Sequence, residues 1–138
     1  GLNRAQKYGT EFLKYREWVK NEIVIIAQIE HIEAVDNLEQ ISSVEGIDGV
    51  IVGPYDLSAS LGYPGEYNRI EVKNALDRIN DIIIKSKLSL GFHVIDSNYE
   101  AVIEKKNKNF NFLAFSMDSL FLGSKIRYEM NQLKNINK

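Results

Sequence analysis

The chain has 138 residues, of which 44% are hydrophobic and 26% are charged, and it contains no cysteine. This length and balance suit one globular domain with a hydrophobic core and exclude a disordered chain. The formal net charge of −2 gives no support for a nucleic-acid or membrane surface. The absence of cysteine excludes disulfides, zinc–thiolate sites and a thiol nucleophile, and it suits a cytoplasmic protein.

The N-terminus lacks the pattern of a secretory signal peptide, and no apolar stretch has the length of a membrane span. Because the first residue is Gly1 and not an initiator methionine, we expect the chain to be a processed product or a fragment. In chain order, the first predicted element is a helix over residues 10–20. Its apolar residues are Phe12, Leu13, Trp18 and Val19.

Four apolar segments predict strands that alternate with helices. The strands are expected over residues 23–30, 49–54, 90–95 and 112–117. Continuous apolar runs are typical of parallel strands that are buried on both faces.

Helices with one buried face are predicted between and after these strands, because apolar residues recur there every three or four positions. The segment between the first two strands carries Ile32, Val35, Leu38, Ile41 and Val44. A longer stripe after the second strand consists of Val72, Ala75, Leu76, Ile79, Ile82 and Ile83. The two later helices are marked by Tyr99, Val102 and Ile103, and by Leu120, Ile126, Met130 and Leu133.

The order of these elements predicts an α/β fold in which residues 1–138 form a single domain. Repeated strand–helix units favour a parallel sheet with helices on its outer faces. A closed eight-stranded barrel needs roughly 200 residues or more. The chain is therefore expected to be half of a barrel or a small open sheet.

Two carboxylates, Glu30 and Asp56, follow the first and second strands. Ligands of parallel α/β proteins bind at this carboxyl end of the strands. Two acidic groups there predict a site for a hard cation with room for substrate. The structural alternatives are an exposed Glu30 near the N-terminus of the next helix and an Asp56 that is the N-cap of its own helix.

Two further features accompany the carboxylates. Gln28 lies two residues before Glu30, so both side chains point to the same side of the strand. Gly53 permits close approach of a ligand to the backbone, and the N–H groups near Tyr55 and Asp56 are available to a substrate carboxylate.

The sequence resembles the class II pyruvate aldolases of the HpcH/HpaI family over nearly its whole length. Three motifs carry the resemblance: Gln28-Ile29-Glu30, Val44-Glu45-Gly46-Ile47-Asp48-Gly49-Val50, and Gly53-Pro54-Tyr55-Asp56-Leu57-Ser58-Ala59-Ser60-Leu61-Gly62. The opening Arg4-Ala5-Gln6-Lys7-Tyr8-Gly9 is similar to the family's segment after its fourth strand. The strands around residues 91–95 and 114–118 fit more loosely.

This resemblance implies the C-terminal half of a (β/α)8 barrel that cleaves 4-hydroxy-2-oxo acids to pyruvate and an aldehyde. By motif match, Glu30 and Asp56 would bind a divalent metal (Mg²⁺, Mn²⁺ or Co²⁺). Gln28 would contact substrate, and the backbone at Tyr55 and Asp56 would bind the pyruvate carboxylate. A homo-oligomer is expected, because the family's last helix tends to pack on a neighbouring subunit.

The chain departs from the family in its proton-transfer groups. The family's catalytic His and its transition-state Arg come from the first half of the barrel, so the fragment alone is expected to be inactive. His31 and His93 are alternative bases, but a structural role is favoured for each. Asp118 is expected to cap the last helix, and Arg4 is expected to be structural.

Two other functions remain open from the sequence. One is a CoA-thioester lyase of the citrate-lyase β-subunit type. The other is a non-catalytic half-barrel that binds metal and oxo acid.

Overall fold

A computed structural model describes residues 2–136 and confirms the predicted α/β class. Four parallel strands form one sheet in the order β1-β2-β3-β4. The strands are β1 (Ile26–Ile29), β2 (Gly49–Val52), β3 (Ser89–Val94) and β4 (Phe112–Phe115). Each strand therefore pairs with its neighbours in the chain, as consecutive strands commonly do.

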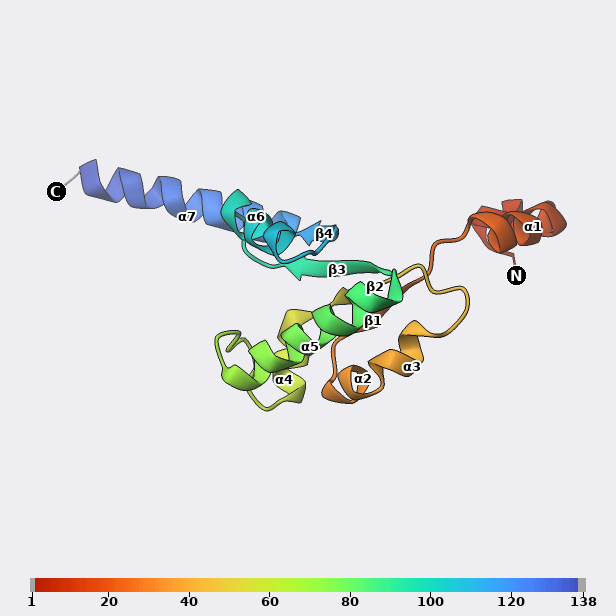
Figure 1. The fold of residues 1–138 in the computed structure, drawn as a ribbon. Helices are drawn as coiled ribbons and strands as arrows, with labels where there is room; N and C mark the ends of the chain where they lie inside the picture. Colours follow the sequence, from red (N-terminus) through yellow and green to blue (C-terminus); the bar gives the residue numbers. More distant parts are fainter. Residues whose placement is uncertain (1, 137–138) are drawn as a thin grey trace.

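Helices precede, connect and follow these strands (Figure 1). A 3₁₀ segment, η1 (Arg4–Gly9), and α1 (Phe12–Glu22) come before β1. The connecting helices are α2 (Ile32–Asp36), α3 (Leu38–Ser42), α4 (Pro54–Ser60), α5 (Ile70–Ser86) and α6 (Tyr99–Asn107). The last helix, α7 (Asp118–Ile136), continues through Gly123.

The hydrophobic core lies between one face of the sheet and helices α2 to α6. Alternate strand residues point into it, as the two-residue period of a strand dictates. These residues are Ile29, Val50, Val52, Leu90, Phe92 and Val94. The predicted stripe of α5 is confirmed, because Val72, Ala75, Ile79 and Ile83 are buried.

The opposite face of the sheet is not covered by the helices that build the core. Helix α7 extends away from the sheet in one direction and α1 in the other (Figure 1). Both helices expose apolar side chains, including Trp18, Ile126, Met130 and Leu133. Within residues 2–136, none of the helices combines the length and hydrophobicity of a membrane crossing.

The first strand is shorter than predicted, and its expected beginning is exposed. Ile23, Val24 and Ile25 lie outside β1 and are 43–69% exposed. Asp48 ties this segment to β2, since the Ile25 N–H donates to Asp48 Oδ2 at 2.7 Å. The other strands agree with the prediction to within two residues, and β4 ends at Phe115 instead of residue 117.

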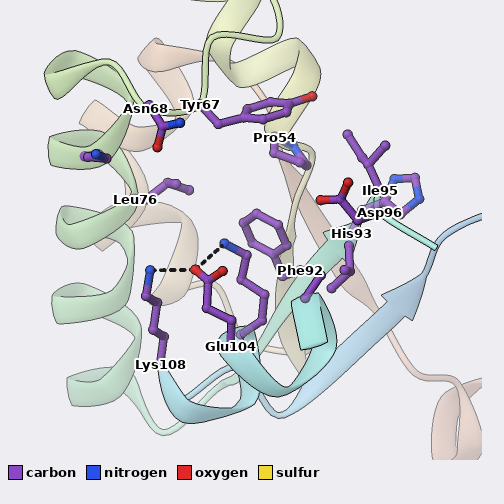
Figure 2. A pocket seen from close by; sticks show the side chains of 14 residues that line it. Pro54, Tyr67, Asn68, Leu76, Phe92, His93, Ile95, Asp96, Glu104 and Lys108 are labelled. Atoms are coloured by element: carbon purple, nitrogen blue, oxygen red, sulfur yellow. Dashed lines mark hydrogen bonds and ion pairs between the residues drawn. The ribbon is translucent and has the colours of Figure 1, made fainter. Parts of the chain in front are cut away.

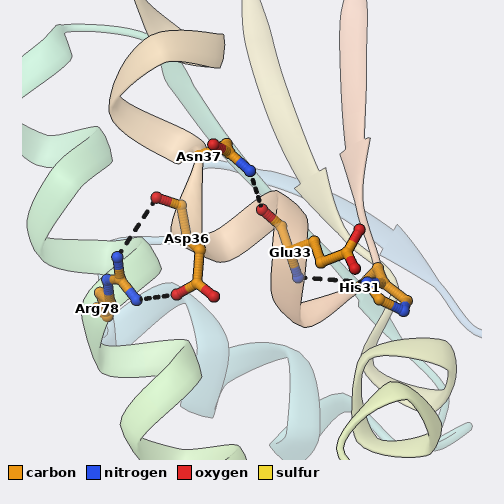
Figure 3. A network of polar contacts seen from close by, with 5 residues as sticks. All are labelled: His31, Glu33, Asp36, Asn37 and Arg78. Atoms are coloured by element: carbon orange, nitrogen blue, oxygen red, sulfur yellow. Dashed lines mark hydrogen bonds and ion pairs between the residues drawn. The ribbon is translucent and has the colours of Figure 1, made fainter.

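The helical stripe predicted from Ile32 to Val44 is divided between two short helices, α2 and α3. The break lies at Asn37, whose side chain donates to the carbonyl oxygen of Glu33 at 2.8 Å. Asn side chains compete in this way with helical backbone bonds. Arg78 of α5 binds the carboxylate of Asp36 just before the break (Figure 3). Val44 lies beyond α3 and is 56% exposed.

Replacement of Ile79 by alanine should destabilise the fold strongly. Ile79 is fully buried on α5, and large-to-small changes at such positions cost about 2–5 kcal/mol. The matched control is Ile84→Ala on the same helix, where the side chain is 54% exposed and the change should stay within about 0.5 kcal/mol. Urea unfolding followed by circular dichroism measures both, and equal losses would contradict the assigned core.

Candidate functional site

The candidate site lies at the carboxyl end of the sheet, on the face that the core helices leave open. The register pairs Gln28 with Ile51, and Ile51 with Gly91. Two residues further along each strand, the same register brings Glu30, Gly53 and His93 into one row. The Gly53 N–H donates to the Ile29 carbonyl oxygen, which extends the ladder to this row.

Glu30 and Gln28 form a contact pair on this face. The Gln28 amide donates to Glu30 Oε2, so the carboxylate has a fixed partner. A Cβ atom added at Gly53 would lie 3.2 Å from Gln28 Nε2 and 3.2 Å from Glu30 Oε2. A larger residue at position 53 would therefore have to displace the Gln28–Glu30 pair by a few tenths of an ångström.

Asp56 lies in the first turn of α4, and its prediction as an N-cap is wrong. The N-cap is Gly53, which has no side chain, and Pro54 is the first helical residue. Proline suits that position because its ring fixes a helical φ and the missing N–H would have no helical acceptor. Asp56 is exposed, so its carboxylate is available to a ligand.

Three of the four predicted site residues line one cavity of about 480 Å³. Gln28 comes from β1, and Tyr55 and Asp56 come from the first turn of α4. Glu30 is not part of the cavity wall but contacts Gln28 beside it. The remaining wall consists of Ile51, Val52, Gly53, Pro54, His93, Ile95, Ala114 and Met117.

Two serines that the sequence reasoning missed hold α4 in place. The buried Ser58 donates to the Tyr55 carbonyl oxygen and accepts from the Gly65 N–H. Ser60 accepts from the Ile32 N–H at 3.0 Å, which joins the end of α4 to the start of α2. The signal for them was the repeated serine in the Asp56-Leu57-Ser58-Ala59-Ser60 motif.

The two histidines have different positions. His31 is the N-cap of α2, where its Nδ1 accepts from the Glu33 N–H at 3.2 Å (Figure 3). This contact agrees with the structural role that the sequence favoured. His93 lies on β3 and its ring lines the cavity beside Gln28 and Asp56. His93 therefore belongs to the candidate site and His31 does not.

The other two candidates lie outside the cavity wall. Asp118 begins α7, and its Oδ1 accepts from the Ser119 N–H at 2.7 Å. Asp118 is therefore the first residue of the helix and not its N-cap as expected, although its carboxylate binds a backbone N–H of the first turn. Arg4 lies in η1 near the N-terminus and is exposed.

The donor chemistry of the site fits a hard divalent cation. No group of three or more His, Asp or Glu side chains placed to hold a metal occurs within residues 2–136. Two carboxylates, Glu30 and Asp56, are sufficient for an ion such as Mg²⁺, which usually binds one or two protein carboxylates and takes its other ligands from water and substrate.

Comparison with known proteins identifies the family. The sequence profile of the HpcH/HpaI aldolase/citrate lyase family matches residues 4–121. The chain belongs to this family. It is 34% identical over 121 residues to a 2-keto-3-deoxy-L-rhamnonate aldolase of Klebsiella pneumoniae, with 87% of this chain and 44% of that protein covered. It is 45% identical over 76 residues to a hydroxypyruvate/pyruvate aldolase of Sagittula stellata, with 55% and 30% covered.

A crystal structure supports the HpcH/HpaI fold. An HpcH/HpaI family protein from Burkholderia cenocepacia matches with a TM-score of 0.81 at 24% identity, with 97% of this chain and 51% of that chain covered. The four strands thus correspond to about half of a barrel, as predicted. The chain spans about half the length of this structure and less than half of the two curated relatives.

This HpcH/HpaI half-barrel has a second cavity, of about 160 Å³, between α5 and α6 (Figure 2). Pro54, His93 and Ile95 line both cavities, so the two adjoin at the end of β3. Glu104 binds Lys108 at 2.9 Å, and Lys105 lies over the ring of Phe92. The sequence reasoning did not find this cavity, because its residues come from four separate segments.

Two titratable groups of this second cavity have shifted pKa values. Burial raises the pKa of Tyr67, and the nearby charges of Tyr55, Asp96 and Asp56 raise it further. The hydrogen bond from Lys108 lowers the pKa of Glu104, and the charge of Lys105 adds to this effect. Tyr67 therefore stays protonated at neutral pH, and Glu104 stays ionised.

Glu104→Gln should lower the free energy of unfolding relative to the unsubstituted chain at neutral pH. In acid, the two chains should be equally stable. The folded-state pKa of Glu104 is lowered, so its stabilisation is present above the ordinary glutamate pKa and disappears as the pH falls through the lowered value. The effect should be small, because the side chain is 55% exposed. Urea unfolding between neutral and acidic pH, with Glu100→Gln on the same helix as control, provides the measurement. If the difference in unfolding free energy between Glu104→Gln and the unsubstituted chain grew in acid, it would contradict a stabilising role of the ionised Glu104.

Proposed function

We propose that the chain is the metal- and oxo-acid-binding half of a metal-dependent aldolase that cleaves 4-hydroxy-2-oxo acids to pyruvate and an aldehyde. Glu30 and Asp56 would hold one divalent cation such as Mg²⁺, Mn²⁺ or Co²⁺. Gln28 would contact the oxo acid, and the backbone N–H groups of Tyr55 and Asp56 would bind its carboxylate.

The observation that carries this proposal is the contact of Glu30, Gln28 and Gly53 at the carboxyl end of the sheet. The Gln28 amide orients one oxygen of the Glu30 carboxylate and leaves the other free for a cation. The N–H groups of Tyr55 and Asp56 lie in the first turn of α4 and have no helical acceptors. Both residues line the same cavity as Gln28. The site therefore offers acceptors for a cation and donors for an anion side by side.

A divalent cation in this position would act as a Lewis acid on the carbonyl of the oxo acid. The protein residues then have separate tasks. Glu30 and Asp56 supply negative charge, Gln28 keeps Glu30 in one orientation, and Ser58 and Ser60 fix the turn that carries Tyr55 and Asp56.

The names of the curated relatives support an aldolase over the CoA-thioester lyase alternative. One relative is named for 2-keto-3-deoxy-L-rhamnonate and the other for hydroxypyruvate and pyruvate. All three are 2-oxo acids, which present adjacent carboxylate and carbonyl oxygens to a metal. We therefore propose a 2-oxo acid as the ligand and an aldehyde as its reaction partner.

Assembly with other subunits is also part of the proposal. Helix α7 exposes Ile126, Met130 and Leu133, each between 49% and 56%. These residues lie on one side of the helix at three- and four-residue spacing, which suits packing on a neighbouring subunit of a homo-oligomer.

Glu30→Gln and Asp56→Asn should each weaken the binding of Mn²⁺ by at least about tenfold. Loss of even an indirect partner of a metal ligand commonly costs 10–100-fold in affinity. Isothermal titration calorimetry with Mn²⁺ measures the change, and Asp81→Asn on the exposed side of α5 is the control. Unchanged affinity in both site variants would exclude these carboxylates as ligands.

The chain by itself should bind pyruvate but exchange its methyl protons slowly. Proton transfer needs a base within hydrogen-bond reach of the reacting atom, and its loss typically costs about 10²–10⁴-fold. The family resemblance assigns that base to the half of the barrel that this chain does not match. Proton NMR of pyruvate in D₂O with added Mg²⁺ measures the exchange. Rapid exchange that disappears in His93→Ala would show instead that the chain carries its own base.

A further inference from the structure

A groove between α5 and α6 continues the second cavity away from the candidate site. A third cavity, of about 210 Å³, adjoins the cavity of about 160 Å³ that Figure 2 shows. Five residues line both of them: Lys73, Leu76, Phe92, Lys105 and Lys108. The second and third cavities therefore form one groove, and these five residues lie where the two cavities meet.

The middle of this groove is positively charged. Three of the five shared residues are lysines, and none of the five is acidic. The acidic residues of the groove each line one cavity only: Asp96 and Glu104 line the second cavity, and Asp77 lines the third. An anion at the middle of the groove therefore meets more positive than negative charge.

The ion pairs of the groove leave positive charge for a ligand. Lys105 and Lys108 share one acceptor atom, Glu104 Oε1, at 3.4 and 2.9 Å. Lys73 lies across the groove on α5 and makes no ion pair within residues 2–136. Three ammonium groups thus have one carboxylate partner, and the carboxylate of a ligand would supply a second.

The third cavity has an aromatic wall that suits a planar ligand. Phe92 and Phe110 meet edge to face, with their ring centroids 5.0 Å apart, and Leu76 extends this apolar wall. Apolar cavities of about 150 Å³ can hold benzene, so the third cavity has space for one aromatic ring. A ring on this wall would also gain from the preferred geometries of aromatic pairs.

Asn80 supplies a polar contact in the third cavity. Its Oδ1 is buried and has no hydrogen-bond partner among the residues that the structure describes. Exchange of the amide oxygen and nitrogen would place a donor there instead, so either orientation leaves a buried polar atom unpaired. Such an atom lowers stability until it finds a partner. A hydroxyl group is a partner in both cases, because it can donate and accept.

We infer that the groove binds a small aromatic carboxylate that carries a hydroxyl group opposite the carboxylate. The carboxylate would bind the lysine ammonium groups, the ring would pack on Phe92 and Phe110, and the hydroxyl would bind Asn80. Lys73 and Asn80 lie seven residues apart on α5, so they share one face of the helix and are separated by about 10 Å along its axis. A para-substituted ring, together with the long Lys73 side chain, spans this distance.

The test is calorimetric titration of the metal-free chain with 4-hydroxybenzoate, benzoate and the neutral benzamide. 4-Hydroxybenzoate should bind most tightly, benzoate roughly tenfold more weakly for the loss of one hydrogen bond, and benzamide more weakly still. Lys73→Met and Lys108→Met should each reduce the affinity for 4-hydroxybenzoate by roughly fivefold. The control is Lys85→Met, an exposed position of α5 outside the groove, which should leave the affinity unchanged.

Two further variants separate loss of a ligand contact from damage to the fold. Glu104→Gln should strengthen the binding of 4-hydroxybenzoate, because it removes the negative charge beside the lysines, whereas a disturbed fold would weaken binding. Asn80→Ala should abolish the advantage of 4-hydroxybenzoate over benzoate and keep the affinity for benzoate.

The outcomes also separate this groove from the candidate site. No binding of the three probes, equal affinity for benzamide and 4-hydroxybenzoate, or unchanged affinity in both lysine variants would overturn the inference. Displacement of 4-hydroxybenzoate by pyruvate would place the probe in the candidate site and overturn it as well. The proposed function is tested by Mn²⁺ and pyruvate at Glu30 and Asp56, so either hypothesis can fail without the other.

Discussion

The alternation of side chains along four parallel strands is the constraint on which the whole molecule depends. Residues such as Val52 and Phe92 face the helices and form the core, so their neighbours Gly53 and His93 must face the other way. A change of register by one residue would exchange these two sets. Core packing thus selects which side chains are presented on the open face, and the candidate site consists of them.

On the open face of the sheet, the size of the side chains differs from one row of residues to the next. In the row of Gln28, Ile51 and Gly91, a Cβ atom at Gly91 would lie 2.7 Å from the Phe112 ring, so that ring covers the glycine. Gln28 and Ile51 of this row line the cavity. In the next row, Gly53 and Ala114 leave space between Glu30 and His93. The shape of the cavity therefore depends on the alternation of large and small residues from one row to the next. Side chains in the interior of closed barrels are layered in a similar way.

Much of this arrangement could be predicted from the sequence because it depends on local patterns. The strands, the buried stripe of α5 and the placement of Glu30 after β1 follow from periodicity alone. The break at Asn37 depends on one side chain that competes with the helical backbone, and periodicity does not report it. The exposure of Val24, the contact of His93 with Ser116 and the cavity beside Glu104 depend on segments that are distant in the chain. Tertiary geometry alone brings those segments together.

The exposed apolar surface and the candidate site both follow from the open face of the four-stranded sheet. A barrel interior is filled by side chains from opposite strands, and this sheet supplies one side of such an interior. Its edge strands β1 and β4 have unpaired backbone groups on their outer sides, which parallel strands normally satisfy by further pairing. The relatives extend over about twice the length of this chain, which is enough for four more βα units. The row that carries Glu30 and His93 would then face a second half of the barrel, and a ligand in that row would be enclosed from both sides.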